Sequence, residues 1–474
     1  MKPFRWQVLV LLLRCCPMSA QIPVRTPGIM AGEVLSLPGA LQIAVENFQL
    51  LKAKENMANA SRELVEAARK DARPDVSISV ETAYGTLSGL NGLSSGLPGI
   101  TTLTSGPPTA SQNWNAAFGG LYVSDIKWNV YSFGLQHSHV AAARGQYDQD
   151  VADLRQEKFQ QAVRVSGAYL DLLAAQRLRM TMEDNVLRAV QLREIILRRA
   201  ENGLNPGVDS SIANAELSRA RLSLMDAELY EKSLVSHFAV QLGVTNQAFL
   251  LDSTFFLRLP KGLADKPLND IADRNPSLQY LQSRVMTSDL NAEYIRRTGL
   301  PRVSLFAVMQ GRGSGFGRDY STNKSDYSTA FFDGIRPIRT NYLVGLAVTW
   351  SVTDLSKIQS RVAAQRWSSA ALRNEYNWRQ NQLTDQLALA DQQIAIALAK
   401  YREAPIQLNA ARAAYRQKEA LYENGLTTLV DVAQAMYILN RAEIDESVAC
   451  NAVWQAELQR ASAAGDMELF LKQL

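Results

Sequence analysis

The sequence predicts a mixed α/β membrane protein built from two structural repeats. In this fold three copies of the chain share one 12-stranded β-barrel, to which each chain supplies four strands, and the barrel continues as a long α-helical coiled-coil barrel. Three observations predict it. The second half of the chain repeats the first, each half holds two short segments of period two, and each half holds a helical stretch far longer than a globular core requires.

The internal repeat has an offset of about 222 residues and needs no gap over its strongest part. Trp128 recurs as Trp350. Glu-Asn-Gly-Leu occurs at 201–204 and again at 423–426, and in both copies Val-Asp follows after three intervening residues. Each half is therefore expected to be one structural unit. The expected boundaries of the two units are 37–255 and 256–474.

The N-terminus is predicted to be a signal peptide over residues 1–20. Basic residues precede an apolar run at 6–13, and Pro-Met-Ser-Ala offers a cleavage site before Gln21. An extended segment at 21–36 is expected to lead into the first repeat.

Composition excludes several classes of protein. The formal net charge is only +4, which leaves no basic field for nucleic acid. After removal of the signal peptide Cys450 would be the one remaining cysteine, so disulfides cannot hold the exported chain together. No run of about 18 apolar residues follows the signal peptide, so a membrane-spanning helix is not expected.

Each repeat is predicted to open with a helix of about 30 residues, at Leu37–Lys70 and Leu268–Arg297. These helices end shortly before Pro74 and Pro301, because proline disfavours a helical conformation in the residue before it. The chain is expected to enter a strand after each of these prolines.

Alternation of apolar and polar residues predicts one strand pair in each repeat, at 74–84 with 116–132 and at 301–311 with 340–353. A long loop rich in small and polar residues joins the members of each pair. The last strand has the clearest alternation, and its apolar face is expected to carry Tyr342, Val344, Leu346, Val348, Trp350 and Val352.

A long helical hairpin is predicted to follow each strand pair, at 135–243 and 357–471. Its first arm has about 67 residues without a turn signal, and its second arm is about half as long. Pro405 lies inside the second long arm and is expected to kink it. A heptad pattern places these residues of that arm on one buried face: Leu383, Leu387, Ala390, Ile394, Ala397, Tyr401, Ala404, Leu408, Ala411, Tyr415, Lys418 and Tyr422.

Four strands per chain cannot close a barrel, and unpaired strand edges are not tolerated in lipid. The strands are therefore expected to pair with strands of other subunits. Three copies would supply twelve strands, which is enough for an outer-membrane barrel with a pore. The long hairpins would then form a helical tube beneath it.

With these elements in this order, the chain resembles the TolC-type outer-membrane efflux protein family, the outer membrane factors, over nearly all of the region after the signal peptide. The resemblance rests on the duplicated order of elements, on Trp-Asn-Val-Tyr-Ser-Phe-Gly at 128–134, and on the turns Glu-Asn-Gly-Leu-x-x-x-Val-Asp. It implies a homotrimeric, passive exit duct in the bacterial outer membrane that extends into the periplasm. Such ducts work with a periplasmic adaptor and an inner-membrane transporter and export small molecules or polypeptides, without a cofactor.

The resemblance also implies a latch at the periplasmic helical tips. Tyr422 and Asp209 match latch residues of the family. Thr427 stands at the position of the family's latch arginine, and Val208 stands at the position of the threonine that partners it. The latch is therefore expected to have fewer charged contacts than is usual in the family.

The narrowest ring of the pore is implied to contain Asp431 and Gln434, where the family usually has two aspartates. The ring would then carry one negative charge per chain instead of two. The tip turns that would contact the adaptor contain Gly203, Leu204, Gly425 and Leu426.

Simpler roles remain open for several of these residues. Asp431 and Asp209 lie near helix N-termini, where an aspartate commonly just stabilises the helix. Trp128 and Trp350 are expected to lie at the membrane interface, with packing in a core as the alternative.

The remaining candidates for chemistry are weak. His137 and His139 are not expected to bind a metal, because residues two apart on a helix do not face each other. Cys450 is expected to be an apolar packing residue. No catalytic constellation is recognisable, so an enzyme is not expected. The alternative function is a periplasmic coiled-coil adaptor or structural protein without a pore, which would have no use for a strand with one apolar exposed face.

Overall fold

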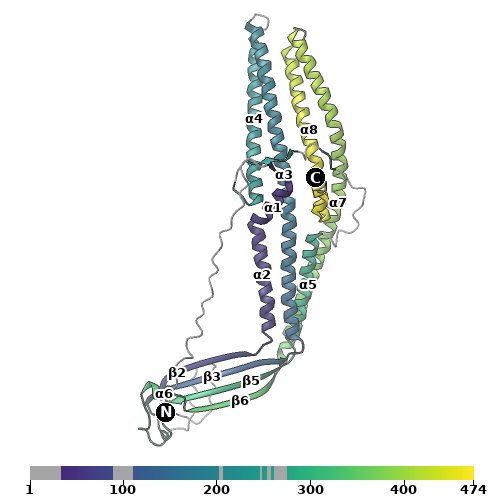
Figure 1. Ribbon diagram of the computed structural model, residues 1–474. Helices are drawn as coiled ribbons and strands as arrows, with labels where there is room; N and C mark the ends of the chain where they lie inside the picture. Colours follow the sequence, from purple (N-terminus) through teal and green to yellow (C-terminus); the bar gives the residue numbers. More distant parts are fainter. Residues whose placement is uncertain are drawn as a thin grey trace.

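The computed structural model describes residues 34–88, 110–201, 207–245, 248–253, 258–260 and 275–473. The predicted signal peptide and most of the extended segment at 21–36 lie outside these residues. The described chain is elongated, with a small sheet at one end and long helices that lead away from it to two tips at the other end (Figure 1).

The sheet has four antiparallel strands in the order β2-β3-β5-β6. Their bounds are Asp75–Thr86 for β2, Ala116–Tyr131 for β3, Arg302–Ser314 for β5 and Arg339–Thr349 for β6. The pairing of β3 with β5 joins the two repeats. Within the described residues β2 pairs with β3 alone and β6 with β5 alone, so both edges of the sheet are open.

The register gives the sheet one apolar face. Residues directly opposite in an antiparallel pair lie on the same face. One row runs from Val76 through Ile126 and Ala307 to Val344. The adjacent row, which belongs to the other face, begins with Asp75 opposite Lys127. Other polar residues of that face are Ser77, Asp125, Gln310, Asn341, Ser304 and Thr349.

The last predicted strand is shorter than expected. The prediction was 340–353, but β6 ends at Thr349 and a 3₁₀ turn occupies Val352–Asp354. Asp354 accepts a hydrogen bond from the Ser351 hydroxyl at 2.8 Å, which favours the turn that leads into the next helix.

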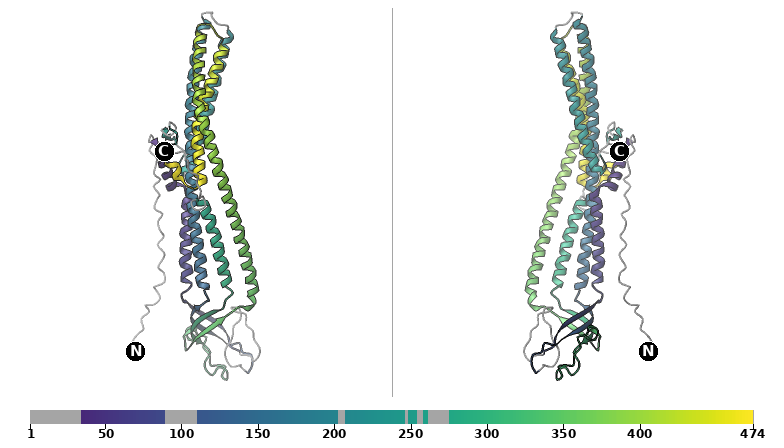
Figure 2. Two further views of the ribbon diagram at one scale, coloured as in Figure 1. Left: turned by 90° about the vertical axis from the view of Figure 1, so that its right-hand side faces the viewer. Right: turned by 90° about the vertical axis from the view of Figure 1, so that its left-hand side faces the viewer.

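Four helices continue from the sheet. They are α2 (Gln49–Lys70), α3 (Leu135–Glu201), α5 (Pro276–Arg297) and α7 (Leu355–Glu423). Each helix packs on the next in the order α2, α3, α5, α7, which is the order of the strands that follow or precede them (Figure 2). The helical layer therefore also has two outer members, α2 and α7.

The first predicted helix, Leu37–Lys70, is in fact two helices. Helix α1 (Leu37–Asn47) is separated from α2 by Phe48, which has an extended backbone. The reason is tertiary, because Asn47 is buried and Gly243, at the end of another helix, approaches its main chain closely. Helix α1 can then pack into the central core while α2 follows α3.

Helix α5 begins at Pro276, later than the predicted Leu268, and residues 268–274 lie outside the described part of the chain. Asn275 caps it, since its side-chain oxygen accepts a hydrogen bond from the Ser277 main-chain N–H at 2.9 Å. Proline follows at the first helical position, where no N–H bond is lost.

The long arms have 67 residues in α3 and 69 in α7, and their return arms α4 (Gly207–Leu242) and α8 (Leu429–Ala464) have 36 each. The heptad prediction is confirmed for ten of its twelve residues, which are buried; Tyr401 and Lys418 are partly exposed. Helix α7 continues through Pro405 without a break. The predicted return arm to Leu471 ends earlier, because Gly465 adopts a left-handed conformation (φ 77°) and α9 (Met467–Leu471) follows it.

Within the described residues two large apolar cores hold the hairpins. The central core joins α1, α3, α4, α8 and α9 with the short parallel strands β1 (Val34–Leu35) and β4 (Leu250–Leu251). The second core lies towards the tips and joins α3, α4, α7 and α8. Among the described residues no helix is both long and apolar enough to cross a membrane.

Candidate functional site at the helical tips

The predicted latch tyrosine lies inside the tip core. Tyr422 lies in the last turn of α7 and is only 4% exposed. The same core contains Ile196 from α3, Leu217 from α4 and Val432 from α8. The ring of Tyr422 is therefore fixed where the two hairpins of the chain meet.

The turn between α7 and α8 is built from local signals. Gly425 has a positive φ of 74°, and its N–H donates to the main-chain oxygen of Tyr422 at 3.0 Å, which closes the helix. Leu426, one of the residues predicted to contact an adaptor, is 73% exposed. Gly203 and Leu204, in the corresponding turn of the first repeat, lie outside the described residues.

Asp431 completes a capping box at the start of α8. Its carboxylate accepts from the Thr427 hydroxyl at 2.8 Å and from the Thr428 hydroxyl at 2.9 Å, and the Thr428 main-chain N–H donates to it at 3.3 Å. These hydrogen bonds, with a contribution from Lys418 at 3.7 Å, hold the pKa of Asp431 below its usual range. The simpler role, support of the helix N-terminus, is thus present in the structure.

Asp431 has a second feature that fits a ring residue, because 46% of its side chain is exposed. Gln434 lies three residues further along α8, so the two share one side of the helix, and it is exposed. Their position at the narrowest part of a pore stays a prediction.

The structure brings Thr427 and Asp431 together and places Asp209 in the first turn of α4. Val208, beside it, is 66% exposed. A hydrogen bond between Tyr422 and Asp209 stays a prediction.

Arg199 is a tip residue that sequence reasoning missed. It lies in the last turn of α3, and its Nη1 donates to the main-chain oxygen of Glu423 at 2.6 Å. Its guanidinium carbon is 5.4 Å from the centre of the Tyr422 ring, in cation–π range. An arginine therefore does contact the end of α7, but it comes from the other hairpin and not from position 427.

At the opposite end of the helices the two repeated tryptophans make equivalent contacts. The Trp128 indole N–H donates to the main-chain oxygen of Ala72 at 2.9 Å, and that of Trp350 donates to Gly299 at 3.1 Å. Each acceptor lies two residues before the proline that ends the helix of the same repeat. Trp128 and Trp350 are 37% and 54% exposed in the single chain, and their place at the membrane interface stays a prediction.

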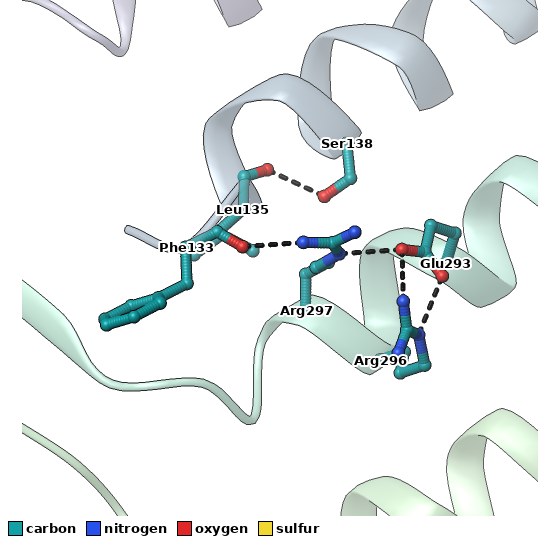
Figure 3. A network of polar contacts seen from close by, with 6 residues as sticks. All are labelled: Phe133, Leu135, Ser138, Glu293, Arg296 and Arg297. Atoms are coloured by element: carbon teal, nitrogen blue, oxygen red, sulfur yellow. Dashed lines mark hydrogen bonds and ion pairs between the residues drawn. The ribbon is translucent and has the colours of Figure 1, made fainter. Parts of the chain in front are cut away.

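An arginine network fixes the turn from β3 into α3 (Figure 3). Nη1 of Arg297 donates to the main-chain oxygen of Phe133 at 2.8 Å, and its Nε donates to Glu293 at 2.7 Å. Phe133 has a positive φ of 50°, which is costly for a bulky residue. Arg296 also donates two hydrogen bonds to Glu293, and the two arginines lower the pKa of this carboxyl to about 2.

His139 and Cys450, two of the residues singled out in the sequence, have contacts or burial that need no ligand. His139 lies 3.5 Å from Asp71 and stacks on Tyr294, whereas His137 is exposed. The described residues contain no cluster of three or more side chains suited to a metal ion. Cys450 is buried, and burial raises the pKa of its thiol to about 11, as expected for a packing residue.

A four-stranded sheet with an apolar face, continued by paired helical hairpins of this length, is the architecture of an outer-membrane channel protein. A protein-family model described as "Outer membrane efflux protein" matches residues 40–231 and 268–466, one range in each repeat. The chain belongs to the outer membrane efflux protein family. Membership confirms the predicted family and the predicted outer-membrane location.

Similarity to individual proteins agrees with this membership. Protein CyaE of Bordetella pertussis is 26% identical over 187 residues, 38% of this chain and 39% of that relative, so the match spans well under half of CyaE. The solved structure of VceC from Vibrio cholerae has 14% identity and a TM-score of 0.70 and covers 91% of this chain and 96% of its own. The Campylobacter jejuni CmeC outer membrane channel has 13% identity and a TM-score of 0.71. The match covers 90% of this chain and 85% of the CmeC chain. The two structural likenesses confirm the predicted mixed α/β fold of the single chain.

Proposed function

We propose that the protein is a passive, homotrimeric exit duct that works with a periplasmic adaptor and an inner-membrane transporter. Its cargo would be small molecules or polypeptides. The observation that carries the proposal is the sheet. Among the described residues its two edges are open, and its apolar face is exposed: Tyr342 is 85% exposed, Leu346 69% and Val348 70%. Such a surface is favourable in lipid and unfavourable in water.

The helices support closure by further copies. The outer members of the helical layer, α2 and α7, adjoin β2 and β6, the edge strands of the sheet. Large apolar side chains are exposed on both, including Leu64 on α2 and Trp367 on α7. Copies placed side by side around an axis would cover the strand edges and these side chains together.

The tips are proposed to act as the gate. Tyr422, Asp209 and Thr427 would form the latch, with Arg199 as a further contact between α3 and α7. Asp431 and Gln434 would line the narrowest ring. The exposed tip residues Gly425 and Leu426, with Gly203 and Leu204 in the other turn, would meet the adaptor.

A mass measurement tests the proposal. Protein extracted from outer membranes in mild detergent, after amine cross-linking, should give a species of three subunits and conduct ions in planar bilayers. A water-soluble monomer that does not conduct would support the alternative, a coiled-coil adaptor or structural protein without a pore.

A further inference from the structure

The open edges of the sheet, β2 and β6, determine how copies of the chain meet. Strand directions alternate along β2-β3-β5-β6, so β6 runs antiparallel to β2. Strand β6 of one subunit can therefore pair with β2 of the next. The inference below rests on the proposed trimer and concerns which residues lie opposite each other in it.

Two conditions limit the register between subunits. The shift per subunit is the number of residues by which the ladder has moved along β2 when it reaches β2 of the next subunit. It must be an even number, because the apolar face must stay continuous around the barrel. Barrel strands tilt by about 35–45° from the barrel axis. Neighbouring strands are about 4.8 Å apart and rise about 3.3 Å per residue, so the tilt displaces each strand by about 1.0–1.5 residues relative to its neighbour. For four strands the shift is then about four or about six residues.

The strands of this chain select between the two values. Glu81 lies near the middle of β2, and the ladder leads from it through Leu121 and Arg312 to Arg339, the first residue of β6. The middle of β6 is Val344. The middle of β6 therefore lies between four and five residues along the strand from the residue that the ladder pairs with the middle of β2. This offset builds up over three strand pairs, and a fourth pair at the same rate brings it to about six residues.

We propose that three copies close the barrel with Gly345 of one subunit opposite Glu81 of the partner subunit. On the apolar face this register places Val348 opposite Ile78 of the partner subunit and Leu346 opposite Val80 of the partner subunit. Apolar pairs of this kind stabilise antiparallel strands. In the single chain all four side chains are exposed, Val348 by 70%, Ile78 by 78%, Leu346 by 69% and Val80 by 61%.

Gly345 lies beside an aromatic ring of its own chain. A Cβ atom there would lie 2.7 Å from the ring of Phe306, which covers the glycine from the neighbouring strand. The glycine leaves room for this ring on the face that carries Glu81. The proposed contact thus brings together a residue without a side chain and one with a long, polar side chain.

Cysteine cross-linking tests the register. In a Cys450→Ala background, Ile78→Cys combined with Val348→Cys should give covalent dimers and trimers on oxidation in native outer membranes. Directly opposite residues have Cβ atoms about 4.5–5.5 Å apart, close to the geometry of a disulfide. The matched controls are Val348→Cys with Val76→Cys, which reports a shift of four, and Val348→Cys with Val80→Cys, which reports a shift of eight.

The expected result is the highest cross-linking yield for the pair with Ile78→Cys and none for single-cysteine variants. A higher yield for either control pair would overturn the register and leave the trimer intact. Amine cross-linking of the same membranes separates the two proposals. Trimers without any disulfide product would contradict the register alone, and monomers would contradict the proposed function as well.

Discussion

Arg199 donates a hydrogen bond to the main-chain oxygen of Glu423, which links the end of α3 to the end of α7 across the two hairpins of the chain. The oxygen belongs to the last turn of α7, where carbonyl groups have no partner within the helix. The positive charge also interacts favourably with the negative end of the helix. This contact links the two hairpin tips at the proposed gate.

The first prediction concerns this link. Arg199→Gln should raise single-channel conductance in planar bilayers, because a hydrogen bond from a charged donor contributes about 1.5–3 kcal/mol. A loss of that size would lower the ratio of closed to open channels by about tenfold or more. Arg198→Gln is the matched control, since that side chain is 78% exposed and lies next to Arg199. Equal conductance of the two variants would show that Arg199 does not hold the tips together.

A second prediction tests the faces of the sheet. Val344→Arg and Val348→Arg should each lower the yield of assembled protein in outer membranes, with a cost of about 2–4 kcal/mol per chain near the bilayer midplane. Thr349→Arg should be tolerated better, because the register places it on the opposite, mostly polar face. Equal assembly of the three variants would contradict the assignment of the lipid face.

Local patterns predicted most of the fold. Period-two alternation located all four strands of the sheet, and the heptad from Leu383 to Tyr422 identified the buried face of α7. The break at Phe48 could not be predicted in this way, since the pattern around it is helical. It depends on the central core, to which Trp454 and Phe470 contribute from the far end of the chain.

In the candidate site, too, local patterns could be predicted from the sequence and contacts between distant helices could not. The capping box of Thr428 and Asp431 carries a local signal, a threonine followed three residues later by an acidic residue, and was within reach of the sequence. The role of Arg199 could not be predicted from the sequence. A basic residue in the last turn of a helix is common for local reasons, and its contact with Glu423 depends on how two distant helices pack.

A third prediction concerns pH and the junction between sheet and helices. The pKa of Glu293 is lowered to about 2 by Arg296 and Arg297, so the folded junction favours the ionised carboxylate. Its contribution to stability is present above the ordinary glutamate pKa of 4.5 and is lost as the pH falls towards about 2. Hydrogen-exchange protection at the end of α5 and in the turn after β3 should therefore decrease between pH 5 and pH 3.

The matched variants for this prediction are Glu293→Gln and Glu63→Gln. The first should reduce protection of the junction already at pH 6, because it removes the negative charge that both arginines contact. The second changes a side chain that is 72% exposed on α2 and should have little effect. Protection that is unchanged in Glu293→Gln would show that the network does not hold the strained turn at Phe133.

The last prediction separates the latch from the ring. Tyr422→Phe together with Asp209→Ala should raise conductance, because the variant removes a hydrogen bond between a phenol and a carboxylate that we expect to contribute about 1.5–3 kcal/mol to closure. Asp431→Asn should leave closure intact, since asparagine keeps an oxygen that can accept from Thr427 and Thr428 at the start of α8. It removes one charge per chain, so it should weaken cation selectivity and block by multivalent cations. If the double variant conducts like the parent while Asp431→Asn alone opens the channel, the roles of latch and ring are reversed.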